Sequence, residues 1–343
     1  MVRVPVRPPR RVVAEVMRVV RWYLEVAYGR WEGPGCVPFF ADQARVGAFA
    51  VDLDRLGRRD PDELFRMLIQ FALYQSRRDV DIMANQRSTK VREAHALTSP
   101  TRLGLLVEGG RCENLRDRDL FDTSCDVRRD FVRGTATCTH RPRTPCHVKE
   151  ATLTIRRMGD MGKMPTSAWL HLGASGMTRI FDQVCNTTNS PTARAVMLVG
   201  QLAQIHRIGR KLAAMFVSAL SVDELSPGFA PWSPDVDGRE LLVIDANVGR
   251  SVLLMRGEGA KTYDAMAQWL EAISSRIDLS CLRSTLPSYS PRLVQQALYV
   301  FRSKSNRSAS GDPCASKVCP ECPSTVCPFR ATSTHTREPK AGC

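Results

Sequence analysis

Residues Ile205–Phe216 read IHRIGRKLAAMF, and this stretch constrains the fold more than any other. The pattern predicts a helix, a tight turn containing Gly209, and a second helix immediately afterwards. Such a hairpin can aim backbone N–H groups and a helix N-terminus at a phosphate, while Arg207 and Arg210 add charge-assisted contacts. An ordinary corner between two helices has the same pattern, so other stretches have to distinguish the two interpretations.

A second informative stretch is Leu241–Arg250, LLVIDANVGR. Its apolar run resembles a strand, and it delivers Asp245 to the start of a helix that carries Arg250. A carboxylate held there could stabilise positive charge on a deoxyribose as its base departs, or it could activate a nucleophile. An Asp in this position is also a common N-cap.

Helical patterns surround both stretches, which predicts a mainly α chain. Asp60-Pro61-Asp62-Glu63 combines an N-cap, a proline and a capping-box glutamate ahead of the apolar run LFRMLIQFALYQ. Further helices are expected over residues 11–29, over 176–184, from Pro191 with Ser190 as its cap, and over 210–220, 260–277 and 291–302.

Residues 104–166 interrupt this pattern as a loop-rich insertion with few apolar periods. It contains four widely spaced cysteines, Cys112, Cys125, Cys138 and Cys146, together with His140 and His147. A structural zinc ion would explain how such a module becomes ordered. Buried free cysteines explain the same residues equally well.

The stretch after Asn306 is rich in Ser, Pro and Cys, and it cannot supply a core. Its cysteines have the spacing Cys314-x4-Cys319-x2-Cys322-x4-Cys327. Four thiolates crowded into so short a segment require a metal, and a four-cysteine set serves an iron–sulfur cluster or zinc. No role is assigned to Cys36, Cys185, Cys281 or Cys343.

The composition favours a polyanionic partner. The 343 residues are 43% hydrophobic and 24% charged, with 49 Lys plus Arg against 35 Asp plus Glu, a net charge of +14. A genome that favours Arg codons gives the same excess on a solvated surface. The sequence has no membrane-length apolar run and no signal-peptide pattern, so a cytoplasmic protein is expected, with cysteines used as metal ligands or buried thiols.

Taken in order, these stretches resemble the endonuclease III family of helix-hairpin-helix DNA glycosylases. IHRIGRKLA is similar to that family's LPGVGxKxA hairpin, IDANVGR to its VDTHVxR segment, and the last cysteines to its cluster loop. FALYQSRRDVDIM (Phe71–Met83) resembles the helix and glutamine-bearing loop that enter the duplex. PRLVQQALYVF (Pro291–Phe301) resembles the helix leading to the cluster.

The resemblance implies a two-lobed fold that grips double-stranded DNA in the groove between its lobes and flips out a damaged or modified base. Asp245 matches the catalytic aspartate, and Lys211 matches the lysine that forms a Schiff base in members that also cleave the strand. Gln75 matches the residue that fills the vacated space, and Arg77 and Arg78 beside it could hold the strands. The DNA-binding set is completed by Arg207, Gly209, Arg210 and Arg250.

The family position of the tail implies a [4Fe-4S] cluster on Cys314, Cys319, Cys322 and Cys327, with zinc as the alternative. Lys317 and Arg330 would then face phosphate. A monomer is expected, associated with the nucleoid if the chain is bacterial. The expected divisions are 1–103 for the first helices, 104–166 for the insertion, 167–257 for the hairpin and Asp245, 258–330 for the last helices and cluster loop, and 331–343 for a disordered tail.

The chain departs from the family pattern in three places. His206-Arg207 replaces the usual Pro-Gly of the hairpin, and Asn247 replaces the usual His. The connection before Asp245 is longer than usual, and it offers Phe229 and Trp232 either for stacking on an extruded base or for packing the loop.

Two rival functions follow from the same residues. One is a glycosylase-like enzyme that modifies a DNA base without excising it, and the other is a non-catalytic helix-hairpin-helix DNA-binding protein. The base itself is not specified by the sequence. Oxidised pyrimidines are the family's default, followed by mispaired adenine and hypermodified bases.

Overall fold

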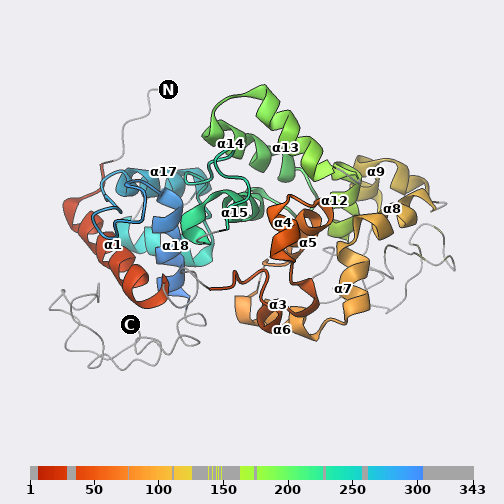
Figure 1. The fold of residues 1–343 in the computed structure, drawn as a ribbon, viewed down its shortest axis with the longest axis horizontal. Coiled ribbons are helices and arrows are strands. Elements are labelled where there is room, and N and C mark those ends of the chain that lie inside the picture. Colours follow the sequence, from red (N-terminus) through yellow and green to blue (C-terminus); the bar gives the residue numbers. More distant parts are fainter. Residues whose placement is uncertain are drawn as a thin grey trace. The chain divides into compact units, whose positions relative to one another are not determined.

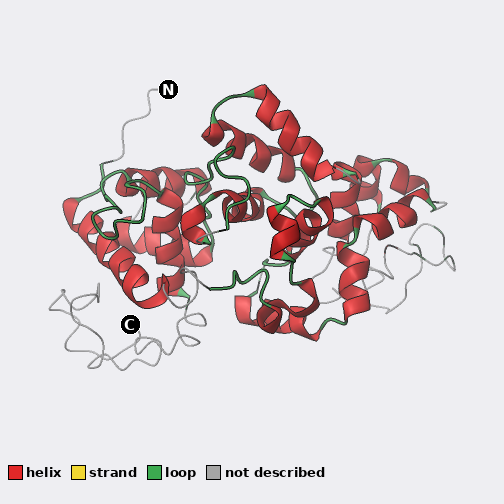
Figure 2. Ribbon diagram, in the orientation of Figure 1, coloured by secondary structure: helices red, strands yellow, loops and turns green. Residues whose placement is uncertain are grey.

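The computed structural model describes residues 7–28, 36–75, 77–109, 112–125, 138, 141, 144, 146, 148, 163–173, 176–226, 229–256 and 262–303. Helices account for most of these residues, and the described ranges contain no strand (Figure 2). The prediction of a mainly α chain is confirmed. The chain divides into two compact units.

The first unit contains the described residues of 1–37, 218–233 and 237–343. Its elements are α1 (Arg10–Trp22), the π-helical turn η1 (Tyr23–Ala27), η5 (Asp223–Leu225), α16 (Ala246–Arg256), α17 (Tyr263–Ser274) and α18 (Pro291–Arg302) (Figure 1). Helix α1 packs against α18, where the Trp22 ring meets the Phe301 ring edge-on with centroids 5.1 Å apart. The beginning and the end of the described chain therefore share one core.

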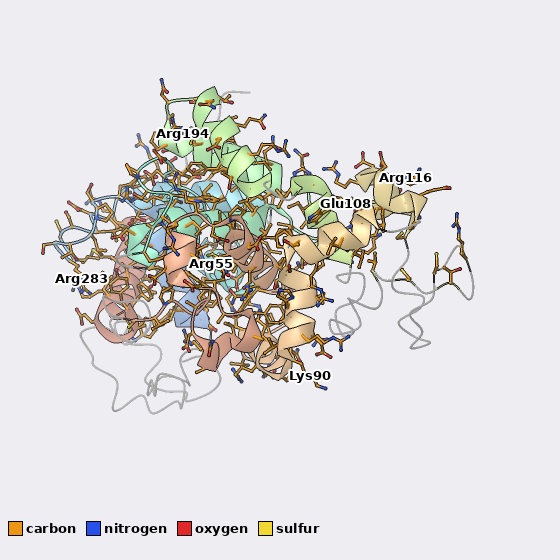
Figure 3. The ribbon with its side chains drawn as sticks, turned by 45° about the vertical axis from the view of Figure 1, so that its right-hand side comes forward. Arg55, Lys90, Glu108, Arg116, Arg194 and Arg283 are labelled. Atoms are coloured by element: carbon orange, nitrogen blue, oxygen red, sulfur yellow. The ribbon has the colours of Figure 1, made fainter. Side chains whose placement is uncertain are left out.

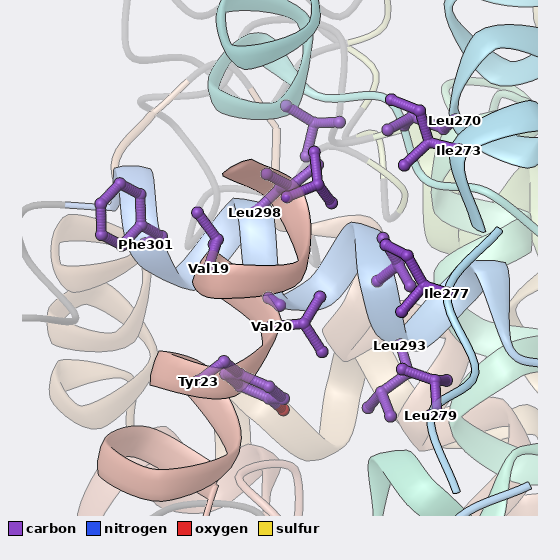
Figure 4. Close-up of a cluster of buried hydrophobic side chains, with 14 of the residues drawn as sticks. Val19, Val20, Tyr23, Leu270, Ile273, Ile277, Leu279, Leu293, Leu298 and Phe301 are labelled. Carbon is purple, nitrogen blue, oxygen red and sulfur yellow. The ribbon is translucent and has the colours of Figure 1, made fainter. Parts of the chain in front are cut away.

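The core of this unit is built from side chains at helical spacing. Val16, Val19, Val20 and Tyr23 lie on one face of α1 and its π-helical extension, and all are buried. Figure 4 shows this cluster with side chains of α17 and α18. Each fully buried aliphatic side chain contributes about 1.5–3 kcal/mol. Leu242, Ile244 and Val248 belong to the same cluster, so the core fixes the stretch that carries Asp245.

The second unit contains the described residues of 38–217 and 234–236. Its elements are α3 (Gln43–Val46), η2 (Gly47–Phe49), α4 (Leu53–Gly57), α5 (Pro61–Ala72), α6 (Asp79–Ser88), α7 (Val91–Thr98), α8 (Pro100–Glu108), η3 (Glu113–Arg116), α9 (Arg118–Ser124), α12 (Met164–Leu172), α13 (Gly176–Thr187), α14 (Pro191–Leu202) and α15 (Arg210–Ser221). Helix α15 continues into the first unit after Val217.

Two predicted helix starts are confirmed by their caps. The Asp60 carboxylate accepts hydrogen bonds from the backbone N–H groups of Asp62 (3.0 Å) and Glu63 (3.2 Å). The Glu63 side chain does not complete the predicted capping box. It is buried, accepts the Asp52 N–H (3.0 Å) and pairs with Arg55 (3.3 Å), which Figure 3 labels. The Ser190 hydroxyl caps α14 by accepting the Ala193 N–H (3.2 Å).

Helix α14 is also anchored by a side chain of its own. The Arg194 guanidinium, labelled in Figure 3, donates to the carbonyl oxygens of Thr188 (2.7 Å), Asp235 (2.9 Å) and Cys185 (3.1 Å). It thereby ties the start of α14 to the end of α13. These hydrogen bonds hold α14, the helix that precedes the turn of the predicted hairpin.

Several predicted boundaries need correction. The first α-helix ends at Trp22 and passes into a π-helical turn, whereas the helix expected over 260–277 covers only Tyr263–Ser274, because Thr262 caps it. The insertion expected to be loop-rich contains the end of α8, η3 and α9, and α12 begins at Met164. Its short helices carry too few apolar periods to be recognised in the sequence.

Among the described helices, none combines the length and the apolar character that a membrane span requires.

Candidate functional site

The stretch Ile205–Phe216 forms a helical hairpin within the second unit. Helix α14 ends at Leu202, and the turn is closed by hydrogen bonds from Ile205 N–H to the Leu202 carbonyl (3.1 Å) and from Ile208 N–H to the Ile205 carbonyl (2.9 Å). Helix α15 then begins at Arg210. Ile205 and Ile208 are buried, so the turn is pinned from below by apolar contacts.

The tip of the turn is exposed and basic. Arg207, Gly209 and Arg210 are all exposed. Arg207 has a φ of 65°, in the left-handed region that favours glycine. A Cβ atom placed on Gly209 would have no neighbour within 4 Å. Neither the packing around Gly209 nor a positive φ therefore requires glycine at this position.

Gln75 holds the turn from the side. Its Nε2 donates to the Arg207 carbonyl oxygen (2.9 Å) and to the Ala72 carbonyl oxygen at the end of α5 (2.6 Å). The predicted duplex-filling residue is therefore bound to the backbone of the hairpin. This contact joins two of the stretches on which the family resemblance rests.

Lys211 lies in the first turn of α15, where its side chain is half-buried. Its Nζ lies 3.5 Å from the Tyr74 carbonyl oxygen, at the outer limit of a hydrogen bond. Burial, followed by the nearby Asp79 carboxylate, raises the pKa of the Tyr74 phenol. The contact between the two residues uses the Tyr74 backbone oxygen.

A third contact reaches the turn from the region predicted as the insertion and its border. The buried Ser167 hydroxyl accepts the His206 N–H (3.1 Å) and donates to the Asp122 carboxylate of α9 (3.0 Å). The contact spans 39 residues between Ser167 and His206. The buried Ser167 hydroxyl therefore connects helix α9 to the hairpin.

Asp245 belongs to the first unit and caps α16. Its Oδ1 accepts the Val248 N–H at 2.7 Å, and its carbonyl oxygen accepts the Gly249 N–H at 2.8 Å. The N-cap role that was one interpretation of the sequence is thus observed. It places the half-buried carboxylate at the positive end of a helix.

The apolar run before Asp245 is not a strand, contrary to its sequence pattern. Residues 241–244 are buried, and their backbone groups bind side chains of other helices. Val243 N–H donates to Gln295 Oε1 (3.3 Å), Ile244 N–H donates to Tyr263 Oη (3.5 Å), and the Tyr263 hydroxyl donates to the Leu242 carbonyl oxygen. These side chains replace the partner strand that a buried extended backbone otherwise needs.

The remaining candidate residues vary in environment. Arg77, Arg78 and Arg250 are exposed, and Arg78 pairs with Asp81 (2.9 Å). The hydrogen bond between them raises the pKa of Arg78 and lowers that of Asp81. Trp232 is fully buried and packs the loop, so its ring is not presented to a base, whereas Phe229 is half-buried.

The cysteines that were considered as metal ligands form two sets. Cys314, Cys319, Cys322 and Cys327 lie outside the described residues, as do His140, His147, Lys317 and Arg330. The four insertion cysteines are described and half-buried. In the part of the chain that the structure covers, no three His, Cys, Asp or Glu side chains are already spaced as metal ligands.

Ser167, Gln295 and Tyr263 were not identified from the sequence. Each acts across a long stretch of chain, 39, 52 and 19 residues respectively, and each is a common residue in an ordinary helical pattern. No local signal distinguishes them from neighbouring polar residues.

Comparison with models of known families, with curated proteins and with solved structures finds no match to this chain.

Proposed function

We propose that this chain is a DNA base-excision glycosylase of the helix-hairpin-helix class. The observation that carries the proposal is the left-handed backbone at Arg207, φ 65°. The family hairpin has glycine at this position, and a left-handed residue costs an L-amino acid about 1–2 kcal/mol. The turn keeps the glycine conformation although its residue is arginine. This supports a hairpin whose backbone is shaped for the close approach of a bound group.

The exposed tip is suited to phosphate. Backbone N–H groups at the start of α15 carry the positive end of the helix dipole, and Arg207 and Arg210 add charge beside them. An uncrowded Gly209 permits an external group to approach the backbone closely. The net charge of +14 favours a polyanion over a neutral ligand.

The chemistry is assigned to Asp245 and Lys211. In this proposal the Asp245 carboxylate stabilises the positive charge that develops on the deoxyribose of a flipped nucleotide. Lys211 supplies an amine that attacks C1′ as the bond from C1′ to the base breaks, and the resulting Schiff base then expels the 3′-phosphate by β-elimination, which cuts the strand. The two residues belong to different units.

The test is a screen of duplexes that each contain one modified base, scored for release of the free base. We expect release from at least one duplex, and loss of that release in Asp245→Asn. Intact DNA of changed mass, with every base retained, would instead identify a base-modifying enzyme. DNA binding without any product would identify a non-catalytic binding protein.

Strand cleavage by Lys211 has a separate test. Borohydride should trap a covalent complex between the chain and the DNA, and Lys211→Ala should abolish it while Lys90→Ala, at an exposed lysine, leaves it intact. A chain that releases the base but gives no trapped complex is monofunctional.

We also propose that Cys314, Cys319, Cys322 and Cys327 hold a [4Fe-4S] cluster. Support comes from their spacing and their place in the family order. Protein prepared without air should be brown and contain iron, and Cys322→Ser should lose that iron. A colourless preparation with zinc bound at the tail would overturn the cluster.

A further inference from the structure

The insertion carries four cysteines that the proposed glycosylase reaction does not use. Cys112 precedes η3, and Cys125 follows the last residue of α9. Cys138 and Cys146 lie on one loop, where Cys138 N–H donates to the Thr144 carbonyl oxygen (2.8 Å). Four thiols thus come from three separate pieces of the chain.

These pieces meet around one small apolar cluster. Its buried members are Leu115, Phe121 and Val148. Cys112, Cys125 and Cys146 all pack against it. Among the described residues of the module, three buried side chains provide little apolar surface to hold it together.

A further contact brings the stretch that carries Cys138 to the same place. Arg141, on the loop between Cys138 and Cys146, lies 3.9 Å from the Glu113 carboxylate, directly after Cys112. This ion pair places the stretch that carries Cys138 beside the residue that follows Cys112.

The surroundings fit a negatively charged metal–thiolate group. The Asn114 Nδ2 donates to Cys125 Sγ at 3.4 Å, the kind of bond that supports a metal-bound sulfur. Lys163 is only 4% exposed, and its ammonium lies over the Phe121 ring of this apolar cluster, 5.8 Å from the ring centroid. Among the described residues, its ammonium has one hydrogen-bond partner, the Asp122 carbonyl oxygen (2.6 Å), and no carboxylate partner.

We propose that Cys112, Cys125, Cys138 and Cys146 bind one structural zinc ion. Four thiolates around a divalent ion leave a net negative charge, which provides the buried Lys163 ammonium with its missing counter-charge. The thiols are neighbours that are not yet at ligand spacing, so binding requires them to rotate onto a common centre. Zinc displaces the four thiol protons, and no oxidant or reductant is needed.

A zinc ion at the end of α9 would also stabilise the helix that holds the hairpin. Asp122 lies three residues before Cys125, and it reaches the hairpin turn through Ser167. The metal site itself is independent of the proposed glycosylase activity.

The test is metal analysis of the full chain, wild type and variants, after purification without added metal. We expect Cys112→Ser, Cys125→Ser, Cys138→Ser and Cys146→Ser each to lose one zinc per chain and leave iron unchanged. Cys281→Ser, an exposed cysteine of the other unit, should keep the zinc. Cys322→Ser should keep this zinc while losing the metal of the tail.

Wild-type protein provides a second readout that does not depend on a variant folding. Chelation should release the zinc and make four additional thiols reactive. Cobalt should restore the site with the intense absorption of a tetrahedral four-thiolate complex, and Cys138→His should bind cobalt with a shifted spectrum. Wild-type protein without zinc, whose insertion thiols react fully before chelation and take up no cobalt, would overturn the site.

Discussion

The hairpin turn and the stretch before Asp245 are both irregular backbone, yet they differ in what they expose. Gln75 and Ser167 hold the turn from neighbouring elements, and its tip presents two arginines to solvent. Residues 241–244 are held by Gln295 and Tyr263 and are buried, and the Asp245 carboxylate that follows them is half-buried. The turn is therefore a surface that can bind a partner, whereas residues 241–244 are a buried support that positions the Asp245 carboxylate.

The largest expected effect belongs to Asp245. Asp245→Asn keeps a side-chain oxygen that can accept the Val248 N–H, so the α16 cap survives while the negative charge is lost. We expect base release to fall about a hundredfold or more, with DNA affinity and unfolding free energy nearly unchanged. Turnover and thermal unfolding measured on the same preparation check both expectations.

Asp245→Ala is the matched control, because it removes the cap as well as the charge. It should lose about 1 kcal/mol of stability in addition to the activity. An Asn variant with the wild-type rate would reduce Asp245 to a helix cap.

The next effect belongs to the buried support. Gln295→Ala removes the acceptor of the Val243 N–H and of one Arg292 N–H (2.8 Å). Because these donors are buried, we expect a loss of about 1–3 kcal/mol in the free energy of unfolding, measured with denaturant. Gln183→Ala, at an exposed helical position, should change it by less than about 0.5 kcal/mol. Equal losses in the two variants would contradict the supporting role.

A smaller effect tests the exposed side of the comparison. Gly209→Ala adds a Cβ that meets no atom of the protein, so stability should be unchanged or slightly higher. If a phosphate approaches this backbone, the same methyl group should weaken DNA binding by roughly fivefold to tenfold, about 1 kcal/mol. Fluorescence anisotropy with a labelled duplex measures the affinity. Wild-type affinity would show that nothing approaches the turn at Gly209.

The smallest effect concerns Arg207. Arg207→Gly should relieve the left-handed strain and raise stability by up to about 1 kcal/mol. It should also lower the salt dependence of DNA binding by roughly one counterion. Arg210→Gly is the control, since Arg210 starts a helix and glycine there should not stabilise. A stability gain in both variants would remove the strain argument.

The sequence predicted the hairpin more completely than the stretch before Asp245. Caps such as Ser190 and the start of α15 at Arg210 follow from local residue chemistry, so both were predicted correctly. The apolar run over 241–244 was expected to be strand-like, because periodicity does not distinguish a paired strand from buried backbone that is bound by side chains. The short helices of the insertion and the contacts of Ser167 arise only from tertiary packing.

The most direct measurement is a mass balance on the duplex that gives a reaction in the screen. Purified wild-type chain should release the modified base in free form and leave an abasic or cleaved strand, and the Asp245→Asn protein should bind the same duplex without release. A duplex that retains every base, whether its mass is changed or unchanged, would contradict base excision.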